Sequence, residues 1–264
     1  MISALRLSFT DASGFGAENW VGLDNYIRVF TDPDILEAVV NTLWYTVLFT
    51  PTAVIGALLL ALALNSPRLP LRGAFRTALF IPFVVSLAVA AFAWSYLLDP
   101  RLGLLNYWLQ GFGIQLGDVL EDPVLAMPAV ALVAVWKNFG FYMVIFLAGL
   151  QDIPASLYEA ARVDGAGPFR RLTNITLPLL SNTLAFVLIF ALIASFQAFD
   201  QIYVMTGGGP YGRTQTVVME IYESGFRKLE LGFASALSYV LLLGTLLLSL
   251  AQFLFFSRRE GDLS

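Results

Sequence analysis

Residues 152–178, DIPASLYEAARVDGAGPFRRLTNITLP, form a polar stretch between two long hydrophobic segments. Asp152 followed by Pro154 is typical of a helix start, because the carboxylate can cap the first turn and proline lacks an N–H that would go unbonded there. Residues 155–164 contain good helix formers, and Gly165 is expected to end the helix in a left-handed conformation. The stretch therefore predicts a short helix with a defined stop.

A second short helix is expected after this stop. Gly167 and Pro168 restart the chain in a new direction, and Arg170 and Arg171 lie in the helix that runs on to Pro178. Helices this short are unstable alone in water, so the helix–break–helix must pack against another surface. We expect an apolar face with small residues on the first helix and a polar face opposite. The two faces would consist of Leu157, Ala160 and Ala161, and of Tyr158, Glu159 and Arg162.

The spacing within this stretch resembles the EAA loop of membrane permeases in binding-protein-dependent ABC importers, the MetI-like family, and in particular its sugar-type branch. The resemblance implies that the stretch is a cytoplasmic coupling helix, bound in a groove of an ATP-hydrolysing subunit. The alternative is an ordinary amphipathic connector on the bilayer surface. The positions to which the resemblance assigns ATPase coupling are Tyr158, Glu159, Ala160, Ala161, Arg162, Asp164, Gly165, Ile175, Leu177 and Pro178.

The composition of the 264 residues indicates an integral membrane protein. Hydrophobic residues make up 58% and charged residues only 13%, whereas a soluble domain has roughly 25% charged residues. The chain has no cysteine and no histidine, so disulfides, thiolate metal sites and the commonest general base are excluded. A net charge of −4 argues against nucleic-acid binding.

The expected fold is all-α, a transmembrane helix bundle within one permease domain, residues 1–264. The family usually has six spans, whereas residues 1–10 are too short to cross a bilayer. Either the assigned start lies inside the first helix, which we favour, or one span is missing; residues 1–37 would then be a truncated first span and an external segment. Five hydrophobic stretches are long enough to span, at 38–64, 75–98, 124–150, 178–199 and 233–256.

Several residues inside these stretches predict how the helices meet. Prolines can be tolerated as kinks where neighbouring helices satisfy the freed carbonyls. Glycines allow close helix contacts, and amide side chains can form hydrogen bonds between helices. The prolines are Pro51, Pro82 and Pro128, the glycines Gly140 and Gly149, and the amides Asn41 and Gln197.

Alternate loops differ in the sign of their charge. Residues 65–77, 151–177 and 257–264 hold eight arginines and five acids, a net charge of +3. The other three connections, 1–37, 99–123 and 200–232, hold six basic and fourteen acidic residues, a net charge of −8. Because cytoplasmic loops carry more Lys and Arg, residues 151–177 and the C-terminus are expected on the cytoplasmic side.

Lys137 is the only charged residue deep within an expected span, where a cation is costly unless it faces protein or water. It could lie on a path for a hydroxyl-rich or phosphate-bearing solute, lined by aromatic and polar neighbours. The alternative is a structural hydrogen bond to a carbonyl or polar side chain of another helix. The candidate pathway residues are Trp136, Lys137, Asn138, Tyr142, Gln197 and Asp200.

The external segment 195–216 resembles a recurrent stretch of sugar-type permeases. Its run Gly207-Gly208-Gly209-Pro210 lacks the Lys-Ser/Thr of a phosphate-binding loop, so we interpret it as a turn. Residues 217–232 are expected to be partly helical, and this loop is a candidate contact for a solute-binding protein. With no P-loop, catalytic triad or metal spacing present, the chain is expected to perform no chemistry and to bind no cofactor.

Together these features predict a permease subunit in a bacterial or archaeal inner membrane. The resemblance implies import of a sugar, polyol or glycerol-phosphate solute by alternating access. It also implies three partners besides membrane lipid: a second permease, a dimer of ATP-binding subunits that use ATP and Mg²⁺, and an extracytoplasmic solute-binding protein. A stand-alone ion-coupled transporter is the alternative, but such proteins usually need acids or histidines within their spans.

Overall fold

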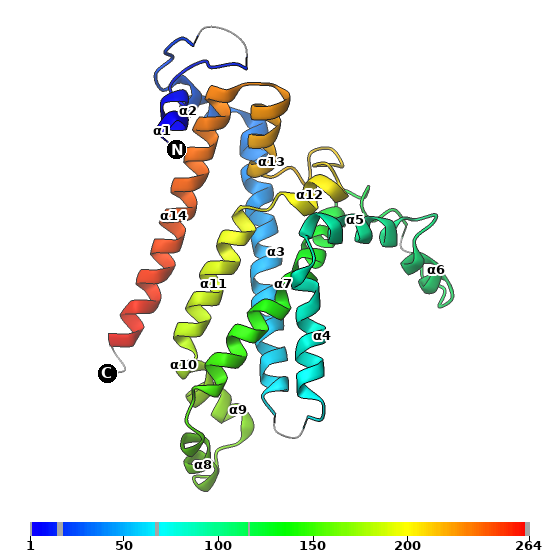
Figure 1. Ribbon diagram of the computed structural model, residues 1–264, viewed down its shortest axis with the longest axis vertical. Helices are drawn as coiled ribbons and strands as arrows, with labels where there is room; N and C mark the ends of the chain where they lie inside the picture. Colours follow the sequence, from blue (N-terminus) through cyan, green and yellow to red (C-terminus); the bar gives the residue numbers. More distant parts are fainter. Residues whose placement is uncertain (1, 15–17, 67–68, 116, 262–264) are drawn as a thin grey trace. The chain divides into compact units, whose positions relative to one another are not determined.

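The computed structural model describes residues 2–14, 18–66, 69–115 and 117–261, with side chains up to Phe256 (Figure 1). The named elements of this part are all helices, two of them short π-helical turns. In chain order they are α1 (Ile2–Leu7), α2 (Asp24–Thr31), α3 (Pro33–Leu64), α4 (Arg72–Val84), α5 (Leu87–Leu98), α6 (Leu104–Gln110), α7 (Ala126–Gln151), α8 (Ala155–Val163), α9 (Pro168–Arg171), η1 (Leu172–Thr176), α10 (Leu177–Leu179), α11 (Ser181–Phe196), α12 (Asp200–Met205), α13 (Val217–Tyr222), η2 (Glu223–Arg227) and α14 (Leu231–Gly261).

Three described helices, α3, α7 and α14, are by themselves long and apolar enough to cross a membrane. Two further pairs qualify only if each broken pair counts as one span, which would bring the total to five. These pairs are α4 with α5, and α9 to α10 with α11. The expected all-helical architecture is therefore confirmed, and the second and fourth expected spans are each interrupted.

The expected span over 75–98, with a kink tolerated at Pro82, consists of two helices separated by a break. Helix α4 ends at Val84, and Val85 adopts an extended conformation with ψ at 140° before α5 begins at Leu87. Pro82 lies in the last turn of α4, where it removes one backbone hydrogen bond. A hydropathy pattern does not register such a break, because the residues on both sides are equally apolar.

The chain forms two compact units. Unit 1 contains residues 1–49, 87–134 and 193–248. Its core joins α2, α3, α13 and α14, and α5 packs along α12. Burial of each large apolar side chain contributes about 1.5–3 kcal/mol to the stability of this core. The fully buried members are Val29, Ile35, Ala38, Val217, Phe233 and Leu237.

Polar side chains of α3 hold the connection that precedes α13 in unit 1. The buried Asn41 donates from Nδ2 to the carbonyls of Gly212 (2.8 Å) and Gln215 (3.0 Å). Thr42 Oγ1 accepts a hydrogen bond from Val217 N at 3.0 Å. These bonds satisfy backbone groups that would otherwise be buried without partners. Asn41 was expected to form a hydrogen bond between helices, but its partners lie in a connecting segment instead.

Unit 2 contains residues 50–86, 135–192 and 249–264, and its helices approach closely at two glycines of α7. A Cβ atom on Gly140 would overlap the Leu79 carbonyl of α4. A Cβ atom on Gly149 would lie 3.0 Å from a Leu180 methyl group and close to Thr183 of α11. Both glycines were expected to permit close helix contacts, and both do.

The prolines of the apolar stretches occupy different positions in their helices. Pro51 lies inside α3, which continues without interruption from Pro33 to Leu64. Pro128 is instead in the first turn of α7, where its missing N–H costs little, so no kink is needed there.

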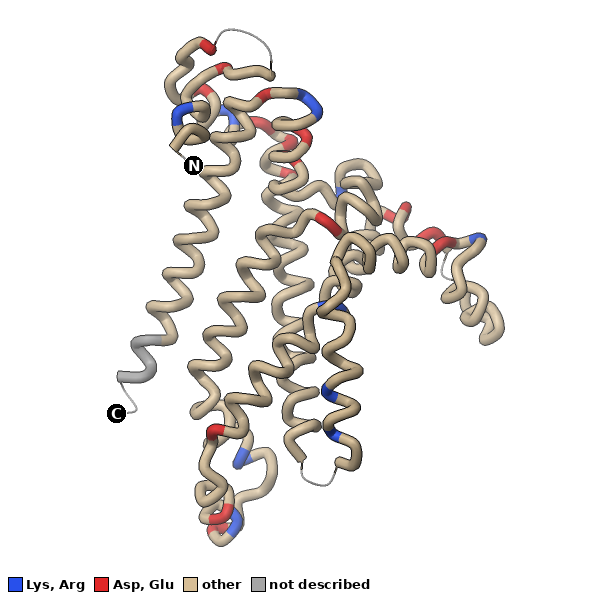
Figure 2. Tube along the Cα trace, viewed as in Figure 1, with Lys and Arg blue, Asp and Glu red and all other residues tan. Residues whose placement is uncertain are grey.

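Figure 2 shows acidic residues gathered in the loops and short helices of unit 1. That unit holds fourteen acids against six basic residues, whereas unit 2 holds nine basic residues against five acids.

Candidate functional site

The break after α8 has the hydrogen bonds of a Schellman cap. Gly165 has φ at +75°, its N–H donates to Arg162 O at 3.1 Å, and Ala166 N–H donates to Ala161 O at 2.8 Å. Both bonds satisfy carbonyls that the end of the helix leaves open. The predicted left-handed stop at Gly165 is confirmed.

The start of α8 differs from the prediction. Pro154 itself is the N-cap residue, with ψ at 130°, and the cap makes no side-chain hydrogen bond. Asp152 lies two residues further from the helix and does not cap it. The first turn of α8 therefore keeps uncapped N–H groups, which a partner can satisfy in an assembly.

The inner face of α8 is not the one expected. Tyr158 and Ala161 are partly buried, whereas Leu157 is 41% exposed and Ala160 is exposed. Tyr158 Oη lies 2.9 Å from Thr176 Oγ1, within hydrogen-bond distance, and this contact joins α8 to η1. Helical spacing alone placed Tyr158 on the outer polar face. Its partner Thr176 is 18 residues away in the sequence, and helical spacing does not predict a contact over that distance.

The second helix starts as predicted, with Gly167 extended at the N-cap and Pro168 in the first helical position. It then widens into the π-helical turn η1, which includes Ile175, and returns to α geometry in α10 with Leu177 and Pro178. All three side chains are partly buried within unit 2. The chain bends by 70° between this helix and α11. The second helix therefore lies at an angle to α11, and its turn η1 contacts α8.

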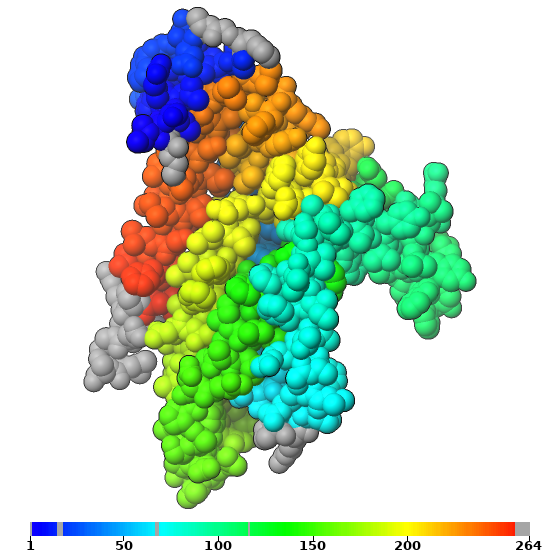
Figure 3. All heavy atoms as spheres, viewed as in Figure 1, coloured from blue at the N-terminus to red at the C-terminus, as the bar shows by residue number. Residues whose placement is uncertain are grey.

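Atoms of this segment, coloured green in Figure 3, lie at the molecular surface, and several of its charged and apolar side chains are exposed. Glu159, Arg162 and Asp164 are exposed, and Glu159 forms no ion pair with any residue the structure describes. Two apolar side chains are exposed next to them, Val163 by 88% and Phe169 by 77%. Apolar side chains rimmed by charges are typical of protein interaction sites.

The candidate pathway residues fall in both units. Trp136, Lys137 and Asn138 are partly buried in α7 of unit 2. Lys137 Nζ donates to Phe83 O at 3.3 Å and lies 4.8 Å from the centre of the Phe83 ring. Tyr142, one turn further along α7, is only 2% exposed. This hydrogen bond to a carbonyl of α4 matches the alternative given from the sequence, in which Lys137 has a structural role between helices.

The other two pathway candidates belong to unit 1. Gln197 follows α11 and Asp200 begins α12, and both are exposed. Their neighbour Gln201 is buried and donates to Tyr45 Oη of α3 at 2.7 Å, a bond between helices that the sequence did not single out.

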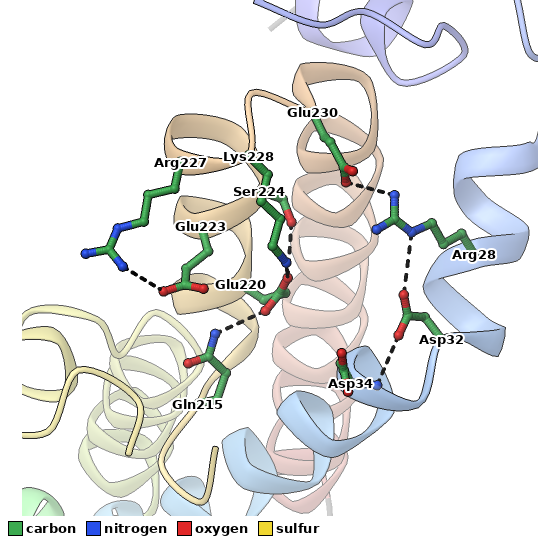
Figure 4. Close-up of polar contacts among 10 residues, drawn as sticks. All are labelled: Arg28, Asp32, Asp34, Gln215, Glu220, Glu223, Ser224, Arg227, Lys228 and Glu230. Atoms are coloured by element: carbon green, nitrogen blue, oxygen red, sulfur yellow. Dashed lines mark hydrogen bonds and ion pairs between the residues drawn. The ribbon is translucent and has the colours of Figure 1, made fainter. Parts of the chain in front are cut away.

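A network of charged residues lies in the loop between α12 and α14 (Figure 4). Glu220 is 6% exposed and accepts hydrogen bonds from Lys228 Nζ (2.9 Å), Gln215 Nε2 (3.0 Å) and Ser224 Oγ (3.1 Å). Burial raises the pKa of the Glu220 carboxyl, but these donors outweigh it and the net pKa lies below its ordinary value. The hydrogen bond to Glu220 raises the pKa of Lys228.

A second ion pair connects α2 to the end of this loop. Arg28 of α2 lies 2.8 Å from Glu230, which precedes α14, and its guanidinium lies 4.0 Å from the centre of the Phe233 ring. Upstream, Gly207 and Gly208 have positive φ and form a turn, as predicted. Within the described residues, no group of three or more acids could hold a metal ion.

Residues 32–260 match the family described as "Binding-protein-dependent transport system inner membrane component". The "Probable ABC transporter permease protein YurN" of Bacillus subtilis is 36% identical over 260 residues, covering 97% of this chain and 89% of YurN. The "sn-glycerol-3-phosphate transport system permease protein UgpA" of Yersinia pestis is 39% identical over 260 residues, covering 97% and 87%.

The fold also resembles a solved structure. A chain in the crystal structure of a bacterial ABC transporter for import of the acidic polysaccharide alginate superposes with a TM-score of 0.84. The two chains are 24% identical, and the match covers 97% of this chain and 88% of the other. This likeness shows the fold.

Proposed function

Because the chain belongs to the family of binding-protein-dependent inner membrane transport components, we propose that it is an importer permease for a sugar or related polyol, glycerol phosphates included. The whole-chain match to UgpA supports this solute class. The chain is a multi-pass transport permease and not an enzyme, since ATP hydrolysis in ABC transporters lies in separate subunits. ATP and Mg²⁺ are therefore bound by partners, and this chain needs no cofactor of its own.

The segment from α8 to α10 is the part that we assign to coupling. It presents Glu159, Val163 and Phe169 outward, while Tyr158 and the Gly165 cap hold its shape from within unit 2. A dimer of ATP-binding subunits binds this surface, and a second permease completes the membrane pathway. To switch a gate from 1:99 to 99:1, ATP-driven closure must supply about 5.5 kcal/mol through this contact.

This assignment requires residues 151–177 and the C-terminus on the cytoplasmic side. It also places the acidic loops of unit 1 outside, where a solute-binding protein delivers solute. The arginine-rich composition of the loops in unit 2 supports this orientation.

Single-cysteine labelling tests the orientation, because the natural chain has no cysteine. Val163→Cys and Phe112→Cys introduce exposed thiols in α8 and in the connection after α6. In intact cells, a membrane-impermeant maleimide should label the Phe112→Cys variant only, and lysis should expose Val163→Cys. Labelling of Val163→Cys in intact cells would refute the coupling assignment. The solute class is tested separately, by identifying the ligand of the partner binding protein.

A further inference from the structure

Unit 2 contains a cavity of about 290 Å³ between the end of α3, the first turns of α4 and the end of α7. Among the described residues, two arginines and no carboxylate line it. The coupling segment contributes no residue to this cavity. Its lining residues are Leu64, Arg72, Gly73, Arg76, Leu147 and Gln151.

The two arginines are one turn apart on the same side of α4, at a spacing that places their Cβ atoms about 6 Å apart. Neither guanidinium has a hydrogen bond or an ion pair within the described part of the chain. In unit 1, by contrast, Arg28 and Arg227 each contact a carboxylate. The cavity therefore has a concentrated positive charge with no counter-ion from the described residues.

The start of α4 adds to this positive potential. Its N-cap residue, Leu71, forms no side-chain cap, so the first N–H groups of the helix are open to an external acceptor. A Cβ atom at Gly73 would meet nothing within 4 Å, so there is room at the same turn for a group to approach the backbone. Guanidinium groups and helix N–H groups both donate hydrogen bonds to phosphate oxygens, so together they favour binding of a phosphate over an apolar ligand.

Exposed apolar side chains follow the arginines along α4. Phe75, Ile81 and Val84 have exposed fractions of 50%, 56% and 74%. Since the polar loop ends here and the apolar helix begins, the first turn of α4 is expected at the depth of lipid headgroups. A soluble phosphate would contact the arginines but would bury none of the exposed apolar side chains of α4.

We propose that this cavity binds the phosphate of an anionic phospholipid, whose acyl chains lie against exposed apolar side chains of α4. Arg72 and Arg76 hold the headgroup, and Gln151 at the end of α7 supplies a further polar contact. Bound lipid then bridges α4 and α7 next to the chain that leads into α8. The site does not depend on which solute the permease carries.

The test uses the complete transporter, delipidated in detergent and examined by native mass spectrometry with dioleoylphosphatidylglycerol as the probe. The double variant Arg72→Gln/Arg76→Gln should bind the probe at least about tenfold more weakly, because two charge-assisted bonds are lost. The Arg101→Gln variant, which removes an exposed arginine of unit 1, should bind it as the natural chain does. Equal affinity in the double variant would overturn the proposal.

Two further arms separate the lipid from other anions and guard against a misfolded variant. Inorganic phosphate at millimolar concentration should fail to displace the probe, and displacement would indicate a soluble anion site instead. In the unmodified chain, a phosphatidylglycerol with a photoreactive headgroup should label the peptide that contains residues 72–76. Labelling confined to other peptides would also contradict the proposal.

Discussion

Lys228 Nζ lies 2.9 Å from Glu220 Oε1, and this pair closes the π-helical turn η2 against α13. The carboxylate side of the pair is only 7% exposed, whereas the lysine side chain is 48% exposed. The pair is therefore partly desolvated, and it is one of the contacts that hold the loop between α12 and α14.

The pair makes the stability of this loop dependent on pH. The folded pKa of Glu220 is below its ordinary 4.5, so its contribution is complete above pH 4.5 and is lost as the pH falls through the folded value. The folded pKa of Lys228 is above 10.5, so its contribution is complete below pH 10.5 and is lost at higher pH. We expect constant amide-exchange protection of residues 217–230 between these limits, after correction for intrinsic exchange. A steady fall between pH 6 and 9 would contradict this account.

Substitution of Lys228 by Met should destabilise the loop by about 1–3 kcal/mol, because Glu220 would remain buried with one donor fewer. The matched control is Arg227→Met, whose exposed ion pair with Glu223 spans 3.4 Å and contributes little. Amide exchange of α13 in the assembled transporter measures the difference. Equal effects of the two substitutions would show that the Glu220 pair has no special role.

Gly165→Val should distort the end of α8, since a β-branched residue at φ +75° costs about 1–2 kcal/mol or more. We expect lower transport and weaker retention of the ATP-binding subunits, with insertion into the membrane unchanged. Gly167→Ala is the control, because Gly167 has φ at −67° and a Cβ atom there meets nothing within 4 Å. Normal transport by the Gly165→Val variant would argue against a shape requirement at the break.

Glu159→Lys should uncouple ATP hydrolysis from transport, because it reverses the charge of an exposed group on α8 that has no partner within the described chain. We expect at least a tenfold loss of solute-stimulated ATPase activity in reconstituted vesicles, equivalent to about 1.4 kcal/mol at the contact. Asp152→Lys makes the same change of charge just before the helix and should have a smaller effect. If both variants were as active as the natural chain, Glu159 would not be at the contact.

Gly140→Ala should separate α4 from α7, because the added Cβ would overlap the Leu79 carbonyl, which cannot rotate away like a side chain. Such overpacking typically costs about 1–3 kcal/mol. Gly244→Ala in α14 is the matched control, since a Cβ atom there meets nothing within 4 Å and alanine favours helix by about 1 kcal/mol. Thermal unfolding of the purified complex, followed by tryptophan fluorescence, should rank Gly140→Ala as the less stable. The reverse order would mean that α4 and α7 are not packed as described.

Local features of the fold could be predicted because they depend on neighbouring residues. The stop at Gly165 and the start at Gly167 and Pro168 follow from allowed backbone conformations, which need no tertiary information. The inner face of α8 could not be predicted, because Tyr158 is held by Thr176 across the break. Asp152 was misassigned because α8 begins at Ala155 with Pro154 as its N-cap, so Asp152 lies too far from the first turn to cap it.

By itself, the sequence determined that the chain is a helical membrane protein, where its long apolar helices lie, and the spacing of the segment that resembles a coupling loop. These properties follow from transfer free energies and backbone preferences, which act over a turn or two of chain. Only the tertiary structure decided that the 75–98 stretch breaks at Val85, that Glu220 is buried beneath Lys228, and that Arg72 and Arg76 line one cavity. Each of these depends on contacts between residues that the folded chain brings together in space, and such contacts add free energies that local sequence patterns do not contain.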